Sequence, residues 1–185
     1  WSAGQTRGQI LEAYAAQGDF FPYWMDHYSF LRMIRTIDPG TAIPDFDYDA
    51  GNKVRRDSVV LTNDILTAPN RFIVISNSGE AGNAPIVGVY DIPSSAPHSI
   101  AQRGFTIPDT QDLQLASNAQ AFAAARNAGI RRTNFERITL ATANDPRHDS
   151  YNIVHFYGVN WLELSWSMQL VAGGSMQHVM RKAYA

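Results

Sequence analysis

The sequence predicts an α+β fold in which a mostly antiparallel sheet rolls into a barrel, with one helix inserted between its strands. Short segments rich in Val, Ile and aromatic residues recur between turn residues along most of the chain. Two helix-forming segments stand far apart, and each begins with a capping-box pattern. Near the end of the chain, a long run of alternating polar and apolar residues indicates a β-hairpin.

The composition limits the classes of function. The 185 residues suit one domain, or one small domain with a subdomain, and 45% hydrophobic residues are ample for a packed core. A net charge of -2 and a pI near 6.2 give no electrostatic case for binding nucleic acid or an anionic membrane. The sequence contains no apolar run of the ~20 residues that a membrane span needs. The absence of cysteine excludes disulfides and thiolate metal sites.

The N-terminal residues 1–38 are predicted to form a helix followed by a β-hairpin. Thr6 and Gln9 have the spacing of a capping box, so the helix is expected over residues 6–17. The expected strands are residues 20–25 and 30–35. Since the chain starts at Trp1 without a methionine or a signal-like segment, we expect a processed chain or, preferably, the ordered part of a longer one.

Residues 39–53 are rich in Pro, Gly and Asp and are expected to be a linker or long loop. Residues 54–185 are expected to form the barrel domain. Ser117 and Gln120 make the second capping box, before an alanine-rich helix predicted over residues 117–128. The expected strands are residues 58–62, 71–76, 86–90, 135–143 and 153–157, with an extended segment over 92–112.

The last predicted element is the hairpin. One set of residues alternates strictly with another, which is typical of a half-buried strand. The apolar set is Leu162, Leu164, Trp166, Met168 and Leu170, and the polar set is Glu163, Ser165, Ser167 and Gln169. Gly173 and Gly174 permit the reversal. The return strand is expected to place Met176, His178, Met180, Lys182 and Tyr184 on one face.

The sequence offers no strong catalytic or metal-binding motif, and no nucleophile or metal cluster is expected within residues 142–184. Asp45, Asp47 and Asp49 resemble the start of a calcium loop, but Ala50 and Arg56 occupy the positions of its glycine and its glutamate. A solvated acidic loop is the better interpretation. His148 and His155 are expected across a turn from each other without a third ligand. We therefore predict no catalytic, cofactor-binding or metal residues, and no cofactor.

Two alternatives from other classes stay open at this point. One is a small monomeric enzyme, hydrolase-like, with His148 and either Asp145 or Asp149 in a cleft. The other is a glycan- or ligand-binding β-domain that uses the aromatic residues near Trp24. Those aromatic residues are more often the core of a small subdomain. They are Phe20, Phe21, Tyr23, Trp24, Tyr28 and Phe30.

Three ordered segments resemble the hub or tail-tip proteins of long-tailed phages, including the tail-associated-lysin type. The first is the strand pair of residues 70–76 and 84–91, followed by Ala96-Pro-His-Ser-Ile100. The second is the helix of residues 116–129 running into 137–142. The third is Asp145-Pro-Arg-His-Asp149 before a strand, with Asn144 and Tyr151-Asn152 departing from the family's usual residues.

The resemblance implies a structural virion protein, not an enzyme, with a tube-like β-barrel and an α/β insertion. Three copies would form a baseplate hub ring under the tail tube, with the tube, distal-tail and tip proteins as partners. It implies a location in the virion tail tip after synthesis in the host bacterial cytoplasm, and nucleic acid would only pass through the lumen. From the hairpin itself, one set of residues is expected to face the lumen or the adjacent subunit. This set is Trp161, Glu163, Ser165, Ser167 and Gln169.

Overall fold

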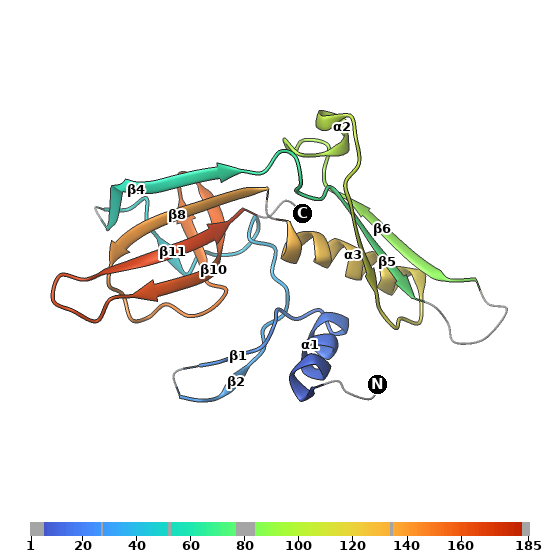
Figure 1. Ribbon diagram of the computed structural model, residues 1–185, viewed down its shortest axis with the longest axis horizontal. Helices are drawn as coiled ribbons and strands as arrows, with labels where there is room; N and C mark the ends of the chain where they lie inside the picture. The colour runs from blue at the N-terminus through green and yellow to red at the C-terminus, as the bar shows by residue number, and fades with distance from the viewer. Residues whose placement is uncertain (1–5, 27, 52, 77–83, 134, 183–185) are drawn as a thin grey trace. The chain divides into compact units, whose positions relative to one another are not determined.

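A computed structural model describes residues 6–26, 28–51, 53–76, 84–133 and 135–182 (Figure 1). The chain divides into two compact units. Unit 1 consists of residues 1–37 and 69–132, and unit 2 consists of residues 38–68 and 133–184. In sequence, residues 69–132 are therefore an insertion between the two halves of unit 2. These units do not follow the division into 1–38, 39–53 and 54–185, which stays a prediction.

Unit 2 is built on a 6-stranded sheet with the order β3-β9-β10-β11-β8-β4. Its strands are β3 Phe46–Asp47, β4 Val54–Asn63, β8 Glu136–Ala143, β9 Ile153–Phe156, β10 Val159–Met168 and β11 Ser175–Arg181. All neighbours pair antiparallel except β3 and β9, which are parallel. The sheet curls into a half-barrel (Figure 1). In its strand order the long strand β4 lies at one edge and the short strand β3 at the other.

A bulge in β10 changes which side chains share a face of this sheet. The register with β11 shifts between Glu163 and Ser165. Before the shift Glu163 lies opposite Met180, and after it Trp166 lies opposite His178. Directly paired residues point to the same side of an antiparallel sheet, and a bulge places two residues against one. Glu163 therefore shares the inner face with Trp166, and the predicted strict alternation through residues 162–170 is wrong.

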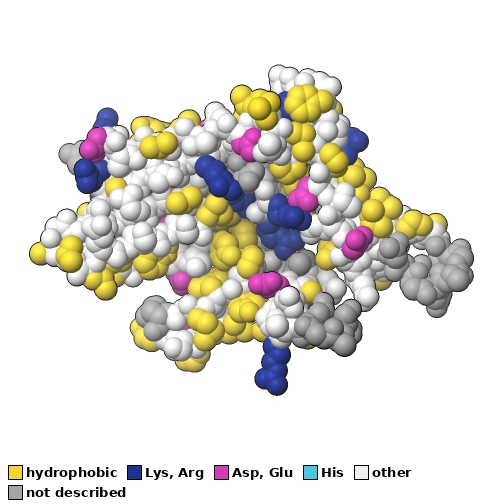
Figure 2. Space-filling view, viewed as in Figure 1, with side chains coloured by type: hydrophobic (Ala, Val, Ile, Leu, Met, Phe, Trp, Pro, Cys, Tyr) yellow, Lys and Arg dark blue, Asp and Glu magenta, His cyan; other side chains and the backbone are white. Residues whose placement is uncertain are grey.

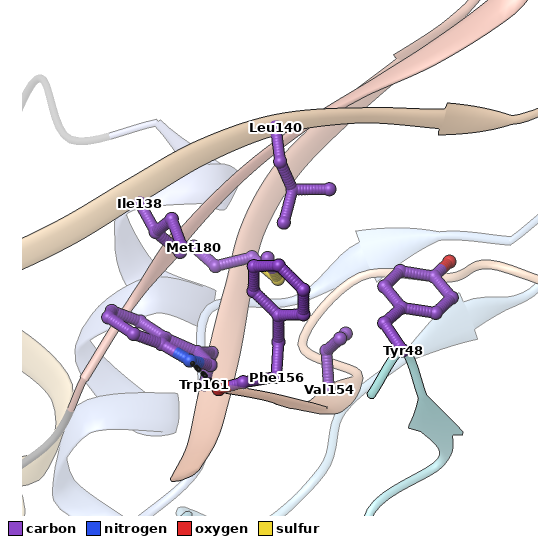
Figure 3. Close-up of a cluster of buried hydrophobic side chains, with 7 residues drawn as sticks. All are labelled: Tyr48, Ile138, Leu140, Val154, Phe156, Trp161 and Met180. Atoms are coloured by element: carbon purple, nitrogen blue, oxygen red, sulfur yellow. Dashed lines mark hydrogen bonds between the residues drawn. The ribbon is translucent and has the colours of Figure 1, made fainter. Parts of the chain in front are cut away.

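The inner face of the sheet carries the hydrophobic core of unit 2 (Figure 3). Its buried members are Tyr48, Ile138, Leu140, Val154, Phe156, Trp161 and Met180. The indole N–H of Trp161 donates a 2.8 Å hydrogen bond to the carbonyl oxygen of Phe156, so the largest side chain in this core has its polar atom satisfied. Ile138 and Leu140 are two apart on β8, as expected for a strand with one buried face.

Unit 1 contains a 3-stranded sheet of order β6-β5-β7, formed by β5 Arg71–Ser76, β6 Ile86–Asp91 and β7 Pro108–Asp112. Helix α3, Asn118–Arg132, packs on this sheet through small residues. Its buried residues are Ala121, Ala125, Ala128, Gly129 and Ile130. A Cβ atom added to Gly129 would lie within 3.4 Å of ring atoms of Tyr90 and Phe72. The absence of a side chain at Gly129 therefore permits the helix to approach the sheet closely.

Unit 1 also contains helix α1, Arg7–Gln17, and the short hairpin of β1 Trp24–Met25 and β2 Leu31–Arg32. The predicted capping box of α1 is confirmed, since Thr6 and Gln9 bond each other's backbone N–H groups at 2.8 and 3.2 Å. The observed strands of this hairpin have two residues each and are much shorter than the predicted strands over 20–25 and 30–35. Phe20 and Arg35 form one further β-bridge.

The α+β class with a mostly antiparallel sheet is confirmed, and several details of the prediction are wrong. The expected linker contains β3, and the expected extended segment contains the short helix α2, Ile100–Arg103, and strand β7. Helix α3 continues through Gly129, where we expected its end, because this glycine serves packing instead of termination. The expected loop over residues 77–83 lies outside the described residues.

Candidate functional site

Three buried polar side chains of unit 2, His148, Glu163 and His178, lie close together, and we call them the His–Glu–His cluster. His148 lies in the loop between β8 and β9, Glu163 on β10 and His178 on β11. All three side chains have 0% exposure to solvent. One ligand-type atom from each lies within 4.8 Å of those of the other two. A fully buried carboxylate between two imidazoles is unusual, because charged side chains are seldom buried without partners.

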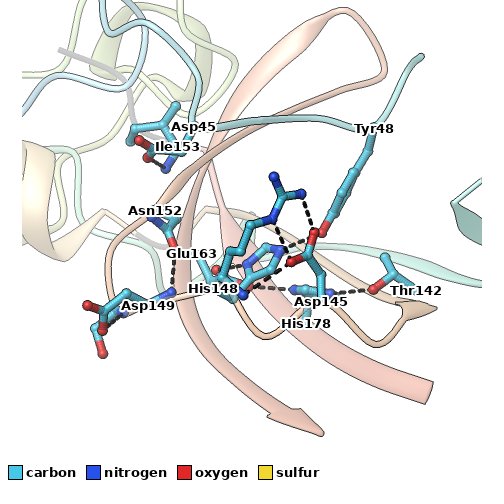
Figure 4. Close-up of polar contacts among 12 residues, drawn as sticks. Asp45, Tyr48, Thr142, Asp145, His148, Asp149, Asn152, Ile153, Glu163 and His178 are labelled. Atoms are coloured by element: carbon cyan, nitrogen blue, oxygen red, sulfur yellow. Dashed lines mark hydrogen bonds and ion pairs between the residues drawn. The ribbon is translucent and has the colours of Figure 1, made fainter. Parts of the chain in front are cut away.

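The cluster is the centre of a continuous chain of polar contacts (Figure 4). Glu163 Oε2 lies 2.8 Å from Nδ1 of His148, and Glu163 Oε1 lies 2.5 Å from Nδ1 of His178. On their far sides, His148 Nε2 contacts the hydroxyl of Tyr48 at 2.5 Å and His178 Nε2 contacts the hydroxyl of Thr142 at 2.8 Å. Both ring nitrogens of each histidine are therefore engaged.

Aromatic rings enclose the cluster and restrict its access to water. The Phe46 ring stacks on His148 with ring centres 3.8 Å apart, and Tyr48 packs edge-on against His178. Burial and the negative charge of Glu163 raise the pKa of Tyr48 well above its usual range, so this phenol stays protonated. Toward solvent, Arg147 lies over Phe46 and pairs with Asp145. That hydrogen-bonded ion pair holds the pKa of Asp145 well below its usual range.

The expectation that residues 142–184 contain no metal-type cluster is wrong. His148 was considered with His155, but its partner in the structure is His178, and Glu163 joins them. His155 lies on β9 and contacts Asn160 Oδ1 at 2.9 Å. The alternation in the return strand placed His178 correctly beside Met176 and Met180, which are buried. Glu163 was missed because the bulge moves it to their face.

In the described part of the chain, the residues chosen for the enzyme alternative are bonded within unit 2. The imidazole of His148 has no exposed surface and both of its nitrogens are bonded inside the unit. The carboxylate of Asp145 accepts hydrogen bonds from the side chain of Arg147 at 2.9 and 2.6 Å. Asp149 belongs to the loop, where its backbone N–H donates to Asn152 at 2.6 Å.

Known structures show which proteins share this fold, whereas by sequence alone the chain matches no protein-family model and no curated protein. The 43 kDa tail protein of prophage MuSo2 from Shewanella oneidensis matches 98% of the chain at 12% identity, with a TM-score of 0.60. A tail protein from Neisseria meningitidis MC58 matches 98% of the chain at 12% identity, with a TM-score of 0.65. A chain of the virion of a native gene transfer agent particle matches 98% of the chain at 14% identity, with a TM-score of 0.61. The chain has the fold of phage tail proteins.

The matched chain in each of those structures is longer than this chain. The chain covers 55% of the Shewanella protein, 56% of the Neisseria protein and 40% of the gene transfer agent chain. The chain therefore spans about half the length of the first two proteins and less than half of the third. Within the described residues, no helix is long and apolar enough to cross a membrane.

Of the five hairpin residues that we expected at a subunit interface, two are buried and three are exposed. Trp161 and Glu163 are buried inside unit 2, with 2% and 0% exposure, and lie on the inner face of the sheet. Ser165, Ser167 and Gln169 are exposed. Only these three can offer their side chains to a neighbour or a lumen, so the interface proposed below uses them and omits the two buried residues.

The aspartates of the expected acidic loop act on backbone groups. Asp45 accepts from the N–H of Ile153 at 2.7 Å, and Asp47 accepts from the N–H of Asp49 at 3.0 Å. Their carboxylates therefore organise the chain around β3, and the interpretation as a merely solvated loop is incomplete. Of the aromatic residues near Trp24, Phe21 is buried, whereas Tyr28 and Phe30 are 69% and 63% exposed.

Proposed function

We propose that this chain is part of a structural tail protein of a tailed phage or phage-like particle. In this proposal three copies form a hub ring that joins the tail tube to the tip or baseplate, and the chain is not an enzyme. The observation that carries the proposal is the fold, which is shared over 98% of the chain with two tail proteins and a virion component. The resemblance of residues 70–100 and 116–149 to tail hub proteins supports the same class independently.

The surface of unit 2 supports assembly with further chains. Strand β4 is an edge strand of 10 residues, and Val60 and Leu61 on it are 57% and 52% exposed. Unpaired edge strands recruit strands from partners, and natural proteins usually protect them. At the turn between β10 and β11, Leu170 and Val171 are 88% and 66% exposed, and apolar side chains are visible at the tip of this hairpin (Figure 2).

The partners follow from this role. The chain would contact copies of itself and the tail tube, distal-tail and tip proteins, within the virion tail tip, after synthesis in the host bacterial cytoplasm. Symmetric homo-oligomers are the usual product of self-complementary surfaces. A net charge of -2 gives no electrostatic case for binding the nucleic acid that would pass through the lumen of the ring.

The proposal is tested by the symmetry of the assembly that the full-length protein forms. Averaged electron-microscope images of the purified protein or particle should show a threefold ring, at the end of a tube where the particle is intact. A full-length protein that stays a compact monomer at high concentration would overturn the proposal.

Ser165→Arg and Ser167→Arg test the interface. Each places a long charged side chain on the exposed face of β10, so we expect the ring to be lost while circular dichroism and the melting temperature stay those of the wild type. Ser95→Arg, at an exposed serine in unit 1, is the matched control and should assemble normally. Rings of normal symmetry from both hairpin variants would show that this face is not the interface.

A further inference from the structure

The directions of the hydrogen bonds in the His–Glu–His cluster fix where its lone pairs point. The hydroxyl of Thr142 contacts the carbonyl oxygen of Ala143 at 2.9 Å, and a carbonyl can only accept, so Thr142 donates there. Its oxygen must then accept from Nε2–H of His178, which lies 2.8 Å away. A neutral imidazole has one N–H, so Nδ1 of His178 presents a lone pair to Glu163.

The second histidine is arranged in the same way. The hydroxyl of Tyr48 lies 2.5 Å from Nε2 of His148, as the hydroxyl of Thr142 lies 2.8 Å from Nε2 of His178. With its single N–H at Nε2, a neutral His148 donates to the oxygen of Tyr48. The Nδ1 atom of His148 then also presents a lone pair to the carboxylate of Glu163, 2.8 Å away.

The result is a group of four acceptor atoms with no donor among them. They are the Nδ1 atoms of His148 and His178 and both carboxylate oxygens of Glu163. Acceptors at contacts of 2.5 and 2.8 Å repel each other unless a positive charge lies between them. In the described part of the chain, the ion-pair partners of Glu163 are these two histidines, and neither lysine nor arginine is among them. A buried carboxylate requires such compensation.

We propose that the His–Glu–His cluster binds a divalent transition-metal ion of the zinc type. Two imidazole nitrogens and a carboxylate are a ligand set that zinc uses in proteins. Imidazole ligands favour zinc and its neighbours over magnesium and calcium, which prefer oxygen donors. Ligating histidines characteristically donate their other ring N–H to an oxygen that orients them, and Tyr48 and Thr142 provide these oxygens.

The ion has a structural role in this proposal. It ties β10 and β11 to the loop before β9, and all three ligands are fully buried, without access for a substrate. The present contacts of 2.5 and 2.8 Å are shorter than the ~3.3 Å between ligand atoms around a tetrahedral zinc ion with ~2.0 Å bonds. Binding therefore lengthens these two contacts by about 0.5 and 0.8 Å through side-chain rotation. The proposal is independent of the assembly in which the chain takes part.

Metal content of the untagged full-length protein tests the proposal. Mass spectrometry of the elements should find about one zinc equivalent per chain after loading with Zn²⁺ and gel filtration. Titration with Co²⁺ should give the visible absorption of a tetrahedral nitrogen and oxygen site. Removal of the metal with a chelator should lower the melting temperature by about 5 °C or more. Less than about a tenth of an equivalent, without a Co²⁺ spectrum and with no effect of chelator, would overturn it.

Variants locate the ion. Glu163→Gln and His178→Gln should each lose the bound metal and the visible Co²⁺ spectrum. His155→Gln is the matched control, since this histidine of β9 is bonded to Asn160 outside the cluster, and it should retain both. Metal retained by both cluster variants would overturn the assignment of the site. If either variant fails to fold by circular dichroism, the wild-type Co²⁺ titration and metal content still decide the proposal.

Discussion

Gly88 of β6 and Ala121 of α3 are in direct backbone contact. A Cβ atom added to Gly88 would lie 2.1 Å from the carbonyl carbon of Ala121. Gly88 pairs with Val74 of β5, which is buried with 0% exposure, so the contact lies on the face that the helix covers. Helix and sheet can approach this closely only because neither residue has more than a methyl group there.

We expect Gly88→Ala to destabilise the protein by about 3 kcal/mol, because the added methyl group meets backbone that cannot rotate away. Urea unfolding followed by circular dichroism measures the change. The matched control is Gly40→Ala, where the nearest atom to the added group is a carboxylate oxygen of the flexible Asp38 side chain at 3.3 Å. Equal stabilities of the two variants would show that helix α3 does not rest on β6 at this position.

The sequence was sufficient to predict elements that depend on local interactions. The capping box of α1 and the two strands of the last hairpin involve residues close in sequence. Alternation in β11 correctly predicted that Met176, His178 and Met180 share one face, which is buried in the structure, whereas Tyr184 of the same set lies outside the described residues. Local chemistry determines these features, so no knowledge of the tertiary structure was needed.

Features that depend on distant partners were missed. Strand β3 has only two residues, and it exists because Phe46 and Asp47 pair with Val154 and His155 of β9. The bulge in β10 has no glycine to mark it, yet it reverses the face of every residue before it relative to those after it. Glu163 was therefore placed outside, and the cluster that it forms with His148 and His178 could not be predicted.

The turn between β9 and β10 contains a strained tyrosine. Phe156 pairs with Val159, so Tyr157 and Gly158 form a two-residue turn, with φ values of 54° and 70°. Positive φ at both positions is the type I′ pattern, which favours Asn-Gly. We expect Tyr157→Asn to be more stable than Tyr157→Ala by about 0.5 kcal/mol, since both variants lose the stacking on Phe156 and Asn tolerates this conformation better than Ala. Tyr157→Ala retains the strain and loses the stacking on Phe156, and should be less stable than wild type. An Asn variant no more stable than the Ala variant in thermal unfolding would contradict this account.

Asp49 fixes the same turn from another segment of the chain. Its two carboxylate oxygens accept from the N–H groups of Tyr157 and Gly158, each at 2.8 Å. The N–H of Gly158 is the main cause that holds the pKa of Asp49 below its usual value, with the N–H of Tyr157 adding to it against the effect of burial. This stability is present above the unfolded pKa of 3.8 and is lost as pH falls through the folded pKa.

We expect Asp49→Asn to cost about 1 kcal/mol at pH 7, a small value because the carboxylate is partly exposed. The variant should also lose less stability than the wild type when the pH is lowered from 5 to about 2.5. Urea unfolding across this range measures both effects. Asp57→Asn, at an exposed carboxylate paired with Arg55, is the control and should match the wild type. Parallel pH profiles for wild type and Asp49→Asn would exclude the role of this carboxylate.

His98 makes unit 1 sensitive to mild acid. The side chain is fully buried, and burial, with the nearby charge of Arg103, lowers its pKa from 6.5 to about 4. The unfolded chain binds a proton between these two values and the folded chain does not, so stability falls as pH decreases from 6.5 toward 4. The loss from this histidine should be about 2 kcal/mol at pH 5.

The difference between wild type and His98→Gln isolates this effect, because every other titrating group is common to both proteins. Urea unfolding at pH 7 and pH 5 should show that the variant, although less stable at pH 7 through altered packing, loses about 2 kcal/mol less on acidification. If His98→Gln loses as much stability as wild type, the buried imidazole is not the group whose protonation accompanies unfolding.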